Sequence, residues 1–356
     1  MAKSPPNMAS RAAVVLPCSD LNEDITFFCE RLGFRLDAIG PADAPRSANL
    51  SGHGLALRLD VDARASAPLL RIESTELDAG DMEAPGGTSV RVIRPSPPGT
   101  VPPVRDELVI TRYGKDGDFG VGRAGMLYRD LIPSRLGGAV IASHIRIPEG
   151  GPVPDLVHFH SVHFQLIFCI AGWVDLVYED QGPPFRLRAG DCVIQPPEIR
   201  HRVLVASAGL EVIEIGVPAQ HPTSMDHAMD LPTSTHRPER TFSGTRFVLH
   251  RASEVVWQPW RIKGFEAQVT DIAQATGGIA DVQVARYTGN GATSPSTHDA
   301  KFRFDYLRAG ALTLAVEGEE PTVLRAGDSF VVPPGIPNAL THVSSDCELI
   351  EVALYK

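Results

Sequence analysis

Short apolar runs, separated by glycine and proline, fill the chain from about residue 100 to its C-terminus. The 356 residues include 32 glycines and 30 prolines, and punctuation at these intervals is typical of an all-β chain. A first set of expected strands covers residues 140–147, 165–170, 173–178, 192–195 and 203–205. A second set covers residues 282–287, 302–307, 311–316, 329–332 and 349–354. Helical periodicity is weak throughout this region, which favours β-structure.

The two sets of strands are copies of each other. RAGDCVIQPPEIRHRV at residues 188–203 aligns with RAGDSFVVPPGIPNAL at residues 325–340, and AGWVDLVYE upstream answers AGALTLAVE. Farther upstream, RDLIPSRLGGAV resembles TDIAQATGGIA. The chain therefore carries an internal duplication, and the polar, proline-punctuated residues 221–240 between the copies are typical of a linker.

The first hundred residues follow a different pattern. A short strand, VVLP, precedes DLNEDITFFCERLGF, in which apolar residues recur at helical spacing. The segments FRLDAIG, ANLSGHG and LALRLDVD then alternate as strands do. This order predicts a βαβββ unit.

Three histidines in the first copy have the spacing of metal ligands. His158 and His160 stand two positions apart in HFHSVHFQLIFCIAG, so a strand would point both to one face. His201, in GDCVIQPPEIRH, would reach the same point from a neighbouring strand. Three imidazoles can hold a divalent ion and leave positions open for water, dioxygen or substrate. Gln165 is a weaker candidate ligand, and its odd spacing from His160 requires a β-bulge to turn it inward.

These motifs resemble the two sequence motifs of the cupin superfamily. The first is His-x-His followed by an acidic residue and a glycine, and the second is a glycine-Asp turn followed by a proline and a histidine. Two departures stand out, because Gln165 replaces the usual acidic ligand and Glu198 stands where a glycine is common. The resemblance implies a divalent metal on His158, His160 and His201.

The second copy keeps the scaffold of the first without its ligands. The corresponding positions carry Ser296, His298, Arg303 and Asn338, a set that will not hold a divalent metal. A duplicated cupin of this kind is called a bicupin. The N-terminal unit resembles one half of a vicinal oxygen chelate (glyoxalase-like) domain, for which we expect a structural role.

We therefore expect a mainly β fold, with two cupin (double-stranded β-helix or jelly-roll) barrels after a small α+β βαβββ module. The expected boundaries are 1–103 for the module, 104–220 for the metal-binding barrel, 221–240 for the linker and 241–356 for the degenerate, structural barrel.

Residues near the ligands supply further candidates for the site. The catalytic candidates are Glu198 as a general base at the rim, His163 and Tyr178. The substrate-binding candidates are Arg146 as an anion clamp, His144, Trp173 and Cys169. Core packing is the alternative for Tyr178, Trp173 and Cys169. Arg286 occupies the equivalent position in the second copy, and this repetition favours a structural role for Arg146.

Three functions fit this site. The leading hypothesis is an Fe(II)-dependent dioxygenase acting on a small anionic or enolisable molecule, such as an aromatic acid or a diketone, because gentisate-type dioxygenases in the superfamily are also bicupins without an acidic ligand. The second is a non-redox lyase or isomerase that uses Zn, Ni or Mn; Cu is a further candidate metal. The third is a non-catalytic binding or sensor protein.

Composition excludes several other classes. The net charge is −10 and no basic run is present, which argues against nucleic-acid binding and against an anionic membrane surface. No apolar stretch approaches the roughly 18 residues of a membrane span. An N-terminal start with Pro-Pro and Arg does not resemble a signal peptide, and five cysteines without metal-knuckle spacing suit reduced thiols. We therefore expect a cytoplasmic protein with a small-molecule substrate, either monomeric or a homodimer.

Overall fold

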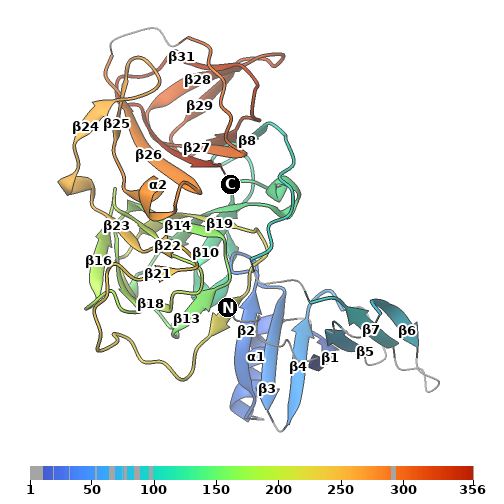
Figure 1. Ribbon diagram of the computed structural model, residues 1–356. Coiled ribbons are helices and arrows are strands. Elements are labelled where there is room, and N and C mark those ends of the chain that lie inside the picture. Colours follow the sequence, from blue (N-terminus) through green and yellow to red (C-terminus); the bar gives the residue numbers. More distant parts are fainter. Residues whose placement is uncertain are drawn as a thin grey trace, which may run out of the picture.

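The structure, a computed structural model, shows a mainly β chain built from a small module and two stacked barrels (Figure 1). It describes residues 11–18, 20–31, 33–52, 54–63, 69–73, 75, 78–83, 89–95, 99–289 and 294–355. The predicted fold class is confirmed. No helix within these ranges is long and apolar enough to cross a membrane.

The N-terminal module has the predicted βαβββ order. It contains β1 (Arg11–Pro17), α1 (Leu21–Thr26) with a π-helical turn η1 (Phe27–Arg31), β2 (Arg35–Gly40), β3 (Ser47–Gly52) and β4 (Leu55–Asp60). Asp20 caps the helix, because its carboxylate accepts from the backbone N–H groups of Asn22 and Glu23. Leu21 packs against Leu50 and other apolar residues of the sheet. The strands β5 (Leu69–Glu73), β6 (Gly80–Glu83) and β7 (Ser89–Ile93), in a segment without a sequence assignment, extend the sheet beyond β1.

The first barrel consists of two facing sheets. One contains β14 (Phe164–Ala171), β19 (Leu210–Val217), β11 (Ile141–Ile147), β10 (Leu127–Asp130), β9 (Gly120–Val121) and β17 (Cys192–Ile194). The other contains β16 (Phe185–Arg188), β15 (Trp173–Tyr178), β18 (His201–Ala206) and β13 (His158–His160), with β12 (Gly151–Pro152) paired to β18. Alternating apolar side chains from both sheets fill the space between them.

The module's sheet continues into the second of these sheets. The connecting strand is β20 (Thr223–Met225), which lies inside the segment expected to be a linker. On one side β20 pairs with β13, where His160 is opposite Thr223, and on the other side it pairs with β2, where Ala38 is opposite Ser224. A single thirteen-stranded sheet therefore runs from the module to the strand that carries two of the candidate ligands.

The second barrel repeats the first in the upper part of Figure 1. Its strands are β24 (Trp257–Pro259), β25 (Phe265–Gln268), β26 (Ala280–Tyr287), β27 (Phe302–Ala309), β28 (Ala311–Val316), β29 (Thr322–Arg325), β30 (Ser329–Val331), β31 (Asn338–Thr341) and β32 (Glu348–Leu354). A short helix, α2 (Ile272–Ala275), precedes β26.

The two barrels exchange short strands across the boundaries expected from the sequence. β8 (Val109–Thr111), which precedes every strand of the first barrel, pairs with β30 of the second barrel. β23 (Val248–His250), which follows the linker, pairs with β17 of the first barrel. Each barrel thus takes an edge strand from the sequence expected to build the other.

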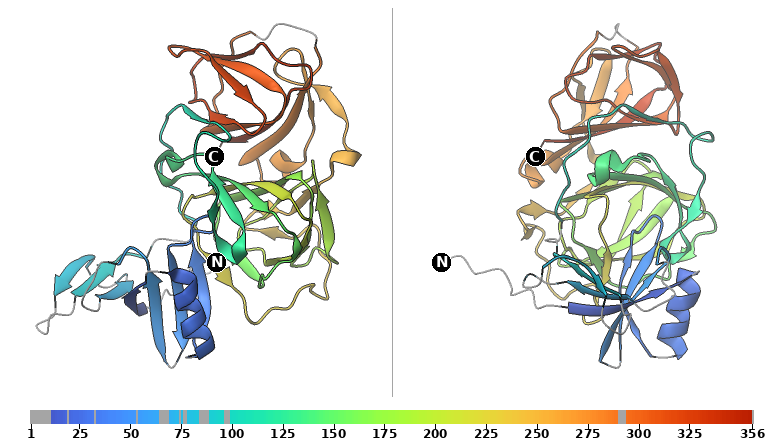
Figure 2. Two further views of the ribbon diagram at one scale, coloured as in Figure 1. Left: turned by 180° about the vertical axis from the view of Figure 1, so that it is seen from behind. Right: turned by 90° about the vertical axis from the view of Figure 1, so that its right-hand side faces the viewer.

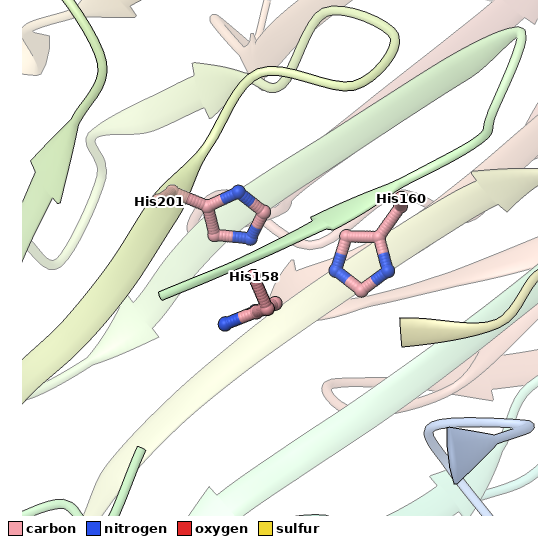
Figure 3. A group of neighbouring side chains, drawn as sticks. All are labelled: His158, His160 and His201. Carbon is pink, nitrogen blue, oxygen red and sulfur yellow. The ribbon is translucent and has the colours of Figure 1, made fainter. Parts of the chain in front are cut away.

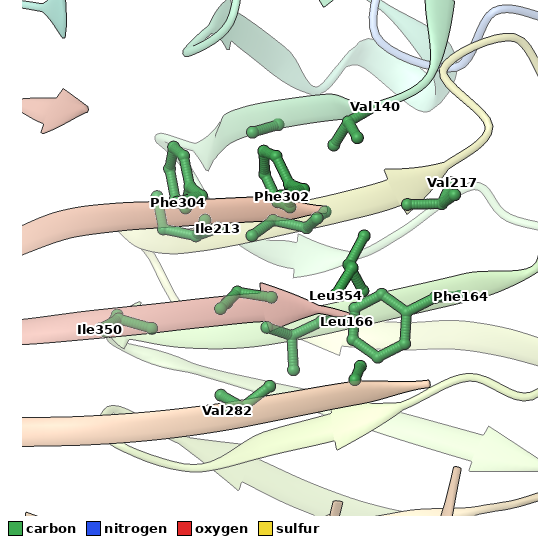
Figure 4. Packing of buried hydrophobic residues seen from close by; sticks show 14 of the residues in the cluster. Val140, Phe164, Leu166, Ile213, Val217, Val282, Phe302, Phe304, Ile350 and Leu354 are labelled. Carbon is green, nitrogen blue, oxygen red and sulfur yellow. The ribbon is translucent and has the colours of Figure 1, made fainter. Parts of the chain in front are cut away.

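The two barrels stack on each other, as both views of Figure 2 show, and buried side chains from both form one apolar core. Phe164 and Leu166 on β14 lie close to Val282 on β26, while Phe302 and Phe304 on β27 lie near β19 (Figure 4). All five side chains are almost fully buried. Buried apolar area contributes roughly 25 cal/mol per Å², so this shared core makes the barrel pair one packed unit.

Candidate metal centre

His158, His160 and His201 converge inside the first barrel, on adjacent strands of one sheet. β13 and β18 are antiparallel, with His158 directly opposite His201. Each histidine has a ring nitrogen within 4.8 Å of one on each of the other two, and all three residues are buried, with exposed fractions of 1%, 5% and 4% (Figure 3). Two strand neighbours and one cross-strand partner thus bring the three imidazoles together.

Backbone hydrogen bonds orient two of the rings. His158 donates from Nδ1 to the carbonyl of Leu156 at 2.7 Å, and His201 donates from Nδ1 to the carbonyl of Ile199 at 2.9 Å. Because a carbonyl can only accept, the proton of each neutral ring is at Nδ1 and the lone pair is at Nε2. The buried Nδ1 of His160 has no hydrogen-bond partner within the described part of the chain. The Nε2 lone pairs of His158 and His201 are therefore free to bind a divalent ion. Metal-binding histidines commonly have this arrangement, in which the other ring nitrogen donates to a backbone carbonyl.

Burial keeps the imidazoles neutral. It is the largest cause lowering the pKa of His158 and His160 well below 6.5, and nearby cationic groups, including Arg123 for both, lower the pKa further. Burial also lowers the pKa of His201 to about 4. At neutral pH all three lone pairs are therefore available, and no proton must leave before an ion binds.

A small cavity of about 80 Å³ adjoins the three histidines. Its walls are largely apolar and include Ala42, Met126, Ile145, Ile147, Ile167, Val174, Leu176, Val203, Leu210 and Val212. Besides the histidines, five residues with polar groups line it: Arg123, Tyr128, Tyr178, Gln195 and Glu214. An apolar site with a few convergent polar groups is typical of small-molecule binding.

Tyr178 is the one member of the predicted catalytic group that lines this cavity. Its ring stacks on His201 with the centroids 5.4 Å apart, and its hydroxyl accepts a hydrogen bond from Gln195 Nε2 at 2.9 Å. Burial raises the pKa of the Tyr178 phenol above its usual 10, so the phenol is a proton donor or packing group rather than an anion.

Gln165 reaches the barrel interior by a route different from the expected one. No bulge continues the strand of His160, because β13 ends there and β14 begins at Phe164 in the facing sheet. The register shift in β14 lies farther on, between Cys169 and Ala171. Gln165 Nε2 donates to Glu214 Oε1 at 2.6 Å, and Gln165 does not line the cavity.

Glu214 on β19 is a buried carboxyl that the sequence reasoning missed. Burial is the largest cause raising the pKa of Glu214, and the amide of Gln165 and the charge of Arg123 oppose it. The duplication carried a signal, because EVIEIGV aligns with ELIEVAL and places Glu214 opposite Glu351. An acidic residue repeated at the centre of two apolar strands is an unusual feature that could have drawn attention to this position.

Arg123 is the second missed residue. It begins a short 3₁₀ turn, η2 (Arg123–Gly125), between β9 and β10. Its Nη1 donates to Asp155 Oδ1 at 2.5 Å, and its Nη2 lies 3.3 Å from His158 Nε2. Asp155 is itself held by the backbone N–H of Val203. A loop residue 35 positions before His158 has no periodicity that could place it in the site.

His144 and Arg146 lie on the opposite face of their strand. Ile145 and Ile147 of β11 face the cavity, and strand alternation turns His144 and Arg146 away from it. Both bind Glu211, with His144 Nε2 at 2.7 Å from Oε2 and Arg146 Nη2 at 2.6 Å from Oε1. The alternation of side chains along a strand predicts two faces from the sequence, but it does not tell which of them is inside.

Glu198 and His163 lie outside the cavity. Glu198 is exposed and accepts a hydrogen bond from the hydroxyl of Ser161 at 3.0 Å. His163 faces a groove between the barrels together with Phe302 and Lys301.

Trp173 and Cys169 also lie outside the cavity. The guanidinium of Arg186 stacks on the indole of Trp173, with its carbon atom 3.3 Å from the ring centroid. Cys169 is fully buried in the apolar core, and burial raises its thiol pKa to about 12. Cys169 thus packs in the core, which was its alternative role, whereas Trp173 is only partly buried and contacts Arg186 instead of packing in the core.

In the second barrel a guanidinium lies among the positions equivalent to the ligands. Arg303, which is buried, donates from Nη2 to Asn338 Oδ1 at 3.0 Å. Its Nε is 3.4 Å from Asp305 Oδ2 and 3.8 Å from Glu351 Oε2. His298 turns its Nε2 to the carbonyl of Val332. A cluster of internal ion pairs thus fills the centre of this barrel.

The N-terminal module closes one side of the cavity. Ala42, in the turn between β2 and β3, lines the cavity and accepts a hydrogen bond from the backbone N–H of Arg123 at 3.4 Å. The next residue, Asp43, is buried and accepts from Arg135 Nη2 at 2.5 Å. The module therefore supports the segment that carries Arg123.

A family model described as a cupin domain matches the chain twice, over residues 143–216 and 283–353. Each repeat thus matches the cupin domain model, and both matches lie outside the N-terminal module. No curated protein sequence matches the chain.

Solved structures with a similar fold include enzymes. An oxalate decarboxylase of Lactobacillus farciminis, crystallised as a formate complex, is 12% identical over 72% of this chain and 87% of its own, with a TM-score of 0.51. A variant oxalate decarboxylase of Bacillus subtilis is 14% identical over 74% and 80% of the two chains, with a TM-score of 0.51. A salicylate 1,2-dioxygenase of Pseudaminobacter salicylatoxidans is 16% identical over 71% and 86%, with a TM-score of 0.50. At such identities the likeness extends to the fold alone.

Proposed function

We propose that this chain is a metal-dependent cupin enzyme whose first barrel binds one divalent ion through His158, His160 and His201. The observation that carries the proposal is the cluster of three buried, neutral imidazoles at the edge of a largely apolar cavity. Structural histidine clusters need no adjoining cavity, whereas a site for chemistry needs room for a reactant. The second barrel and the N-terminal module, whose likeness to half a vicinal oxygen chelate domain rests on its sequence, have structural roles in this proposal.

The favoured activity is that of an Fe(II) dioxygenase on a small anionic or enolisable substrate, of the aromatic-acid or diketone type. When bound, the ion would supply redox electrons and a Lewis-acid centre. All three protein ligands are neutral, so the ion would keep its full charge and attract an anionic substrate. The salicylate dioxygenase with the same fold is consistent with this activity.

The protein's own residues would position the substrate and handle its protons. Apolar side chains such as Ile147 and Val212 exclude water from the cavity. Arg123 offers N–H donors to an anionic group, and Glu214 offers the only carboxyl among the described residues that line the cavity. Glu214 is thus a better candidate than Glu198 for proton transfer, because Glu198 lies on the surface.

A second candidate is a non-redox lyase or isomerase with Zn, Ni or Mn. The observation that favours it is Glu214, because burial raises the pKa of this carboxyl toward the range in which general acids and bases work. The oxalate decarboxylases of the same fold are consistent with a chemistry other than dioxygenation.

One experiment separates these candidates. The full chain, purified without added metal, is reconstituted anaerobically with Fe(II), Mn(II), Ni(II), Cu(II) or Zn(II). Each form is assayed for oxygen uptake and substrate loss with a panel of aromatic acids, diketones and dicarboxylates, and His160→Ala serves as the control. Substrate-dependent oxygen uptake with Fe(II) alone supports the dioxygenase, and substrate loss without oxygen uptake supports the second candidate. Metal and ligand binding without turnover would contradict both and leave a binding or sensor protein.

A further inference from the structure

Arg123 interacts with the nitrogen that a metal ion would use. Because His158 Nδ1 donates to the carbonyl of Leu156, its remaining lone pair is on Nε2, and Arg123 Nη2 lies 3.3 Å from that atom. The guanidinium is buried, and the buried carboxylate of Asp155 holds its other terminal nitrogen at 2.5 Å. The Nε–H of Arg123 is buried without a hydrogen-bond partner among the residues that the structure describes.

A dication on His158 and the guanidinium of Arg123 oppose each other. Imidazole nitrogens bind divalent ions at about 2.0–2.1 Å, so an ion on Nε2 would lie at most about 5.4 Å from Arg123 Nη2 as the guanidinium now stands. Two positive centres at such a distance in a buried site repel strongly. The ion must also replace the hydrogen bond that Arg123 now makes to His158.

An anion between the two would remove this conflict. An oxygen that contacts both the ion and the guanidinium would accept the N–H groups that Arg123 turns from His158, and its charge would offset both cations. Glu214 lines the same cavity, but one of its oxygens already accepts the amide of Gln165. Most of the remaining wall is apolar, with Ile145, Ile147 and Leu210 among its residues, so the rest of the ligand should be small and largely apolar.

We infer that Arg123 couples metal binding to the binding of a small apolar carboxylate. The guanidinium weakens binding of the ion alone and strengthens binding of the ion together with the anion, so that each ligand raises the affinity for the other by the same factor. This inference rests on the proposed metal site and adds to it the substrate class and the residue that selects it.

The test measures affinity for Co(II), whose visible spectrum reports the ligand set, with and without saturating acetate. Acetamide, a neutral molecule of the same shape, controls for effects other than charge. The variants are Arg123→Met and Arg123→Met/Asp155→Asn, the second of which avoids leaving the Asp155 carboxylate alone in the core. The matched control is Arg146→Met, because Arg146 also binds a carboxylate, that of Glu211, but on the outer face of β11. His160→Ala marks binding elsewhere on the chain.

We expect acetate to raise the Co(II) affinity of the wild type and of Arg146→Met at least about tenfold, with a change in the visible spectrum, and acetamide to leave it unchanged. Arg123→Met, alone or with Asp155→Asn, should bind Co(II) more tightly than the wild type and lose the response to acetate. If acetate has no effect on the wild type, or the same effect on both Arg123 variants as on the wild type, the coupling is overturned while the metal site stands. If neither the wild type nor the Arg123 variants bind Co(II) more tightly than His160→Ala, the metal site itself is wrong and the inference fails with it.

Discussion

The side-chain amide of Gln165 donates from Nε2 to Oε1 of Glu214 at 2.6 Å, across the neighbouring strands β14 and β19. The position at which cupins usually carry an acidic ligand therefore holds an amide, and the carboxyl lies on the next strand. This arrangement changes the effect expected of a carboxylate at position 165. It would face a second carboxyl at hydrogen-bond distance, and ionising both groups would be unfavourable because the two negative charges repel each other.

We predict that Gln165→Glu lowers the free energy of unfolding by roughly 1–3 kcal/mol at pH 7, as expected when a buried polar group loses its partner. The double variant Gln165→Glu/Glu214→Gln restores one amide and one carboxyl and should recover most of the loss. Chemical denaturation of both variants measures this. Equal loss in the single and double variants would show that the two side chains do not act as a pair.

The raised pKa of Glu214 predicts how stability depends on pH. A carboxyl with a raised pKa in the folded state stabilises the protein below its unfolded value near 4.5, and this contribution is lost as pH rises through the folded value. Thermal unfolding of the metal-free protein between pH 4.5 and 8 should show this decline, and Glu214→Gln should reduce it. An unchanged pH profile in Glu214→Gln would mean that the carboxyl titrates normally.

The three histidines give the opposite slope. Their pKa values are lowered in the folded state, that of His201 to about 4, so the unfolded chain takes up protons first as pH falls below about 6.5. We expect the metal-free protein to lose stability between pH 6.5 and 4, and His201→Ala to lose less. For the same reason Co(II) affinity should stay nearly constant down to about pH 5, because protons compete with the ion only near the folded pKa values. A steep loss of affinity centred on pH 6.5 would contradict this.

Removing one ligand should abolish metal binding without unfolding the barrel. His160→Ala is expected to lower metal content to near zero and affinity by more than about tenfold, as judged by elemental analysis and circular dichroism. His298→Ala, the equivalent change in the second barrel, is the matched control and should keep the wild-type metal content. Full occupancy in His160→Ala would refute the ligand assignment.

The turn between β2 and β3, which joins the N-terminal module to the cavity, should contribute to the stability of the folded protein through Asp43. Asp43→Ala removes a buried carboxylate and leaves the partly buried guanidinium of Arg135 with one carboxylate partner fewer, which should cost about 1–3 kcal/mol of stability. Asp37→Ala, which breaks the exposed pair with Arg35, should cost under about 1 kcal/mol. Denaturant titration of the two variants compares them, and equal costs would mean that the Asp43 contact is not maintained in solution.

Part of the site could be predicted from the sequence for clear physical reasons. The two-residue period of a strand places His158 and His160 on one face, and the repeated glycine-proline pattern places His201 on the neighbouring strand. Arg123 could not be found in this way, because it lies in a loop whose position depends on packing against the module. Nor could alternation decide that Ile145 rather than His144 faces the cavity. A strand has two faces, and the period of two residues alone does not tell which face is inside.

The same limit applies to the fold. Duplication and turn residues predicted the two barrels, and helical spacing followed by alternation predicted the βαβββ unit. β20 was assigned to a linker, because three residues carry no usable periodicity and their pairing depends on strands far away in the sequence. The short β8 and β23 escaped detection for the same reason.

The exchanged strands β8 and β23 have a consequence for how this protein can evolve. Had the duplicated halves stayed separate, a barrel without a complete set of ligands could be deleted from the gene at little cost. Here a deletion of the second half would also remove the strand that covers β17 of the first barrel, and would leave an open sheet edge and a bare apolar face, both of which promote aggregation. Selection can therefore relax at His298 or Arg303 one residue at a time, but it cannot discard the barrel that carries them.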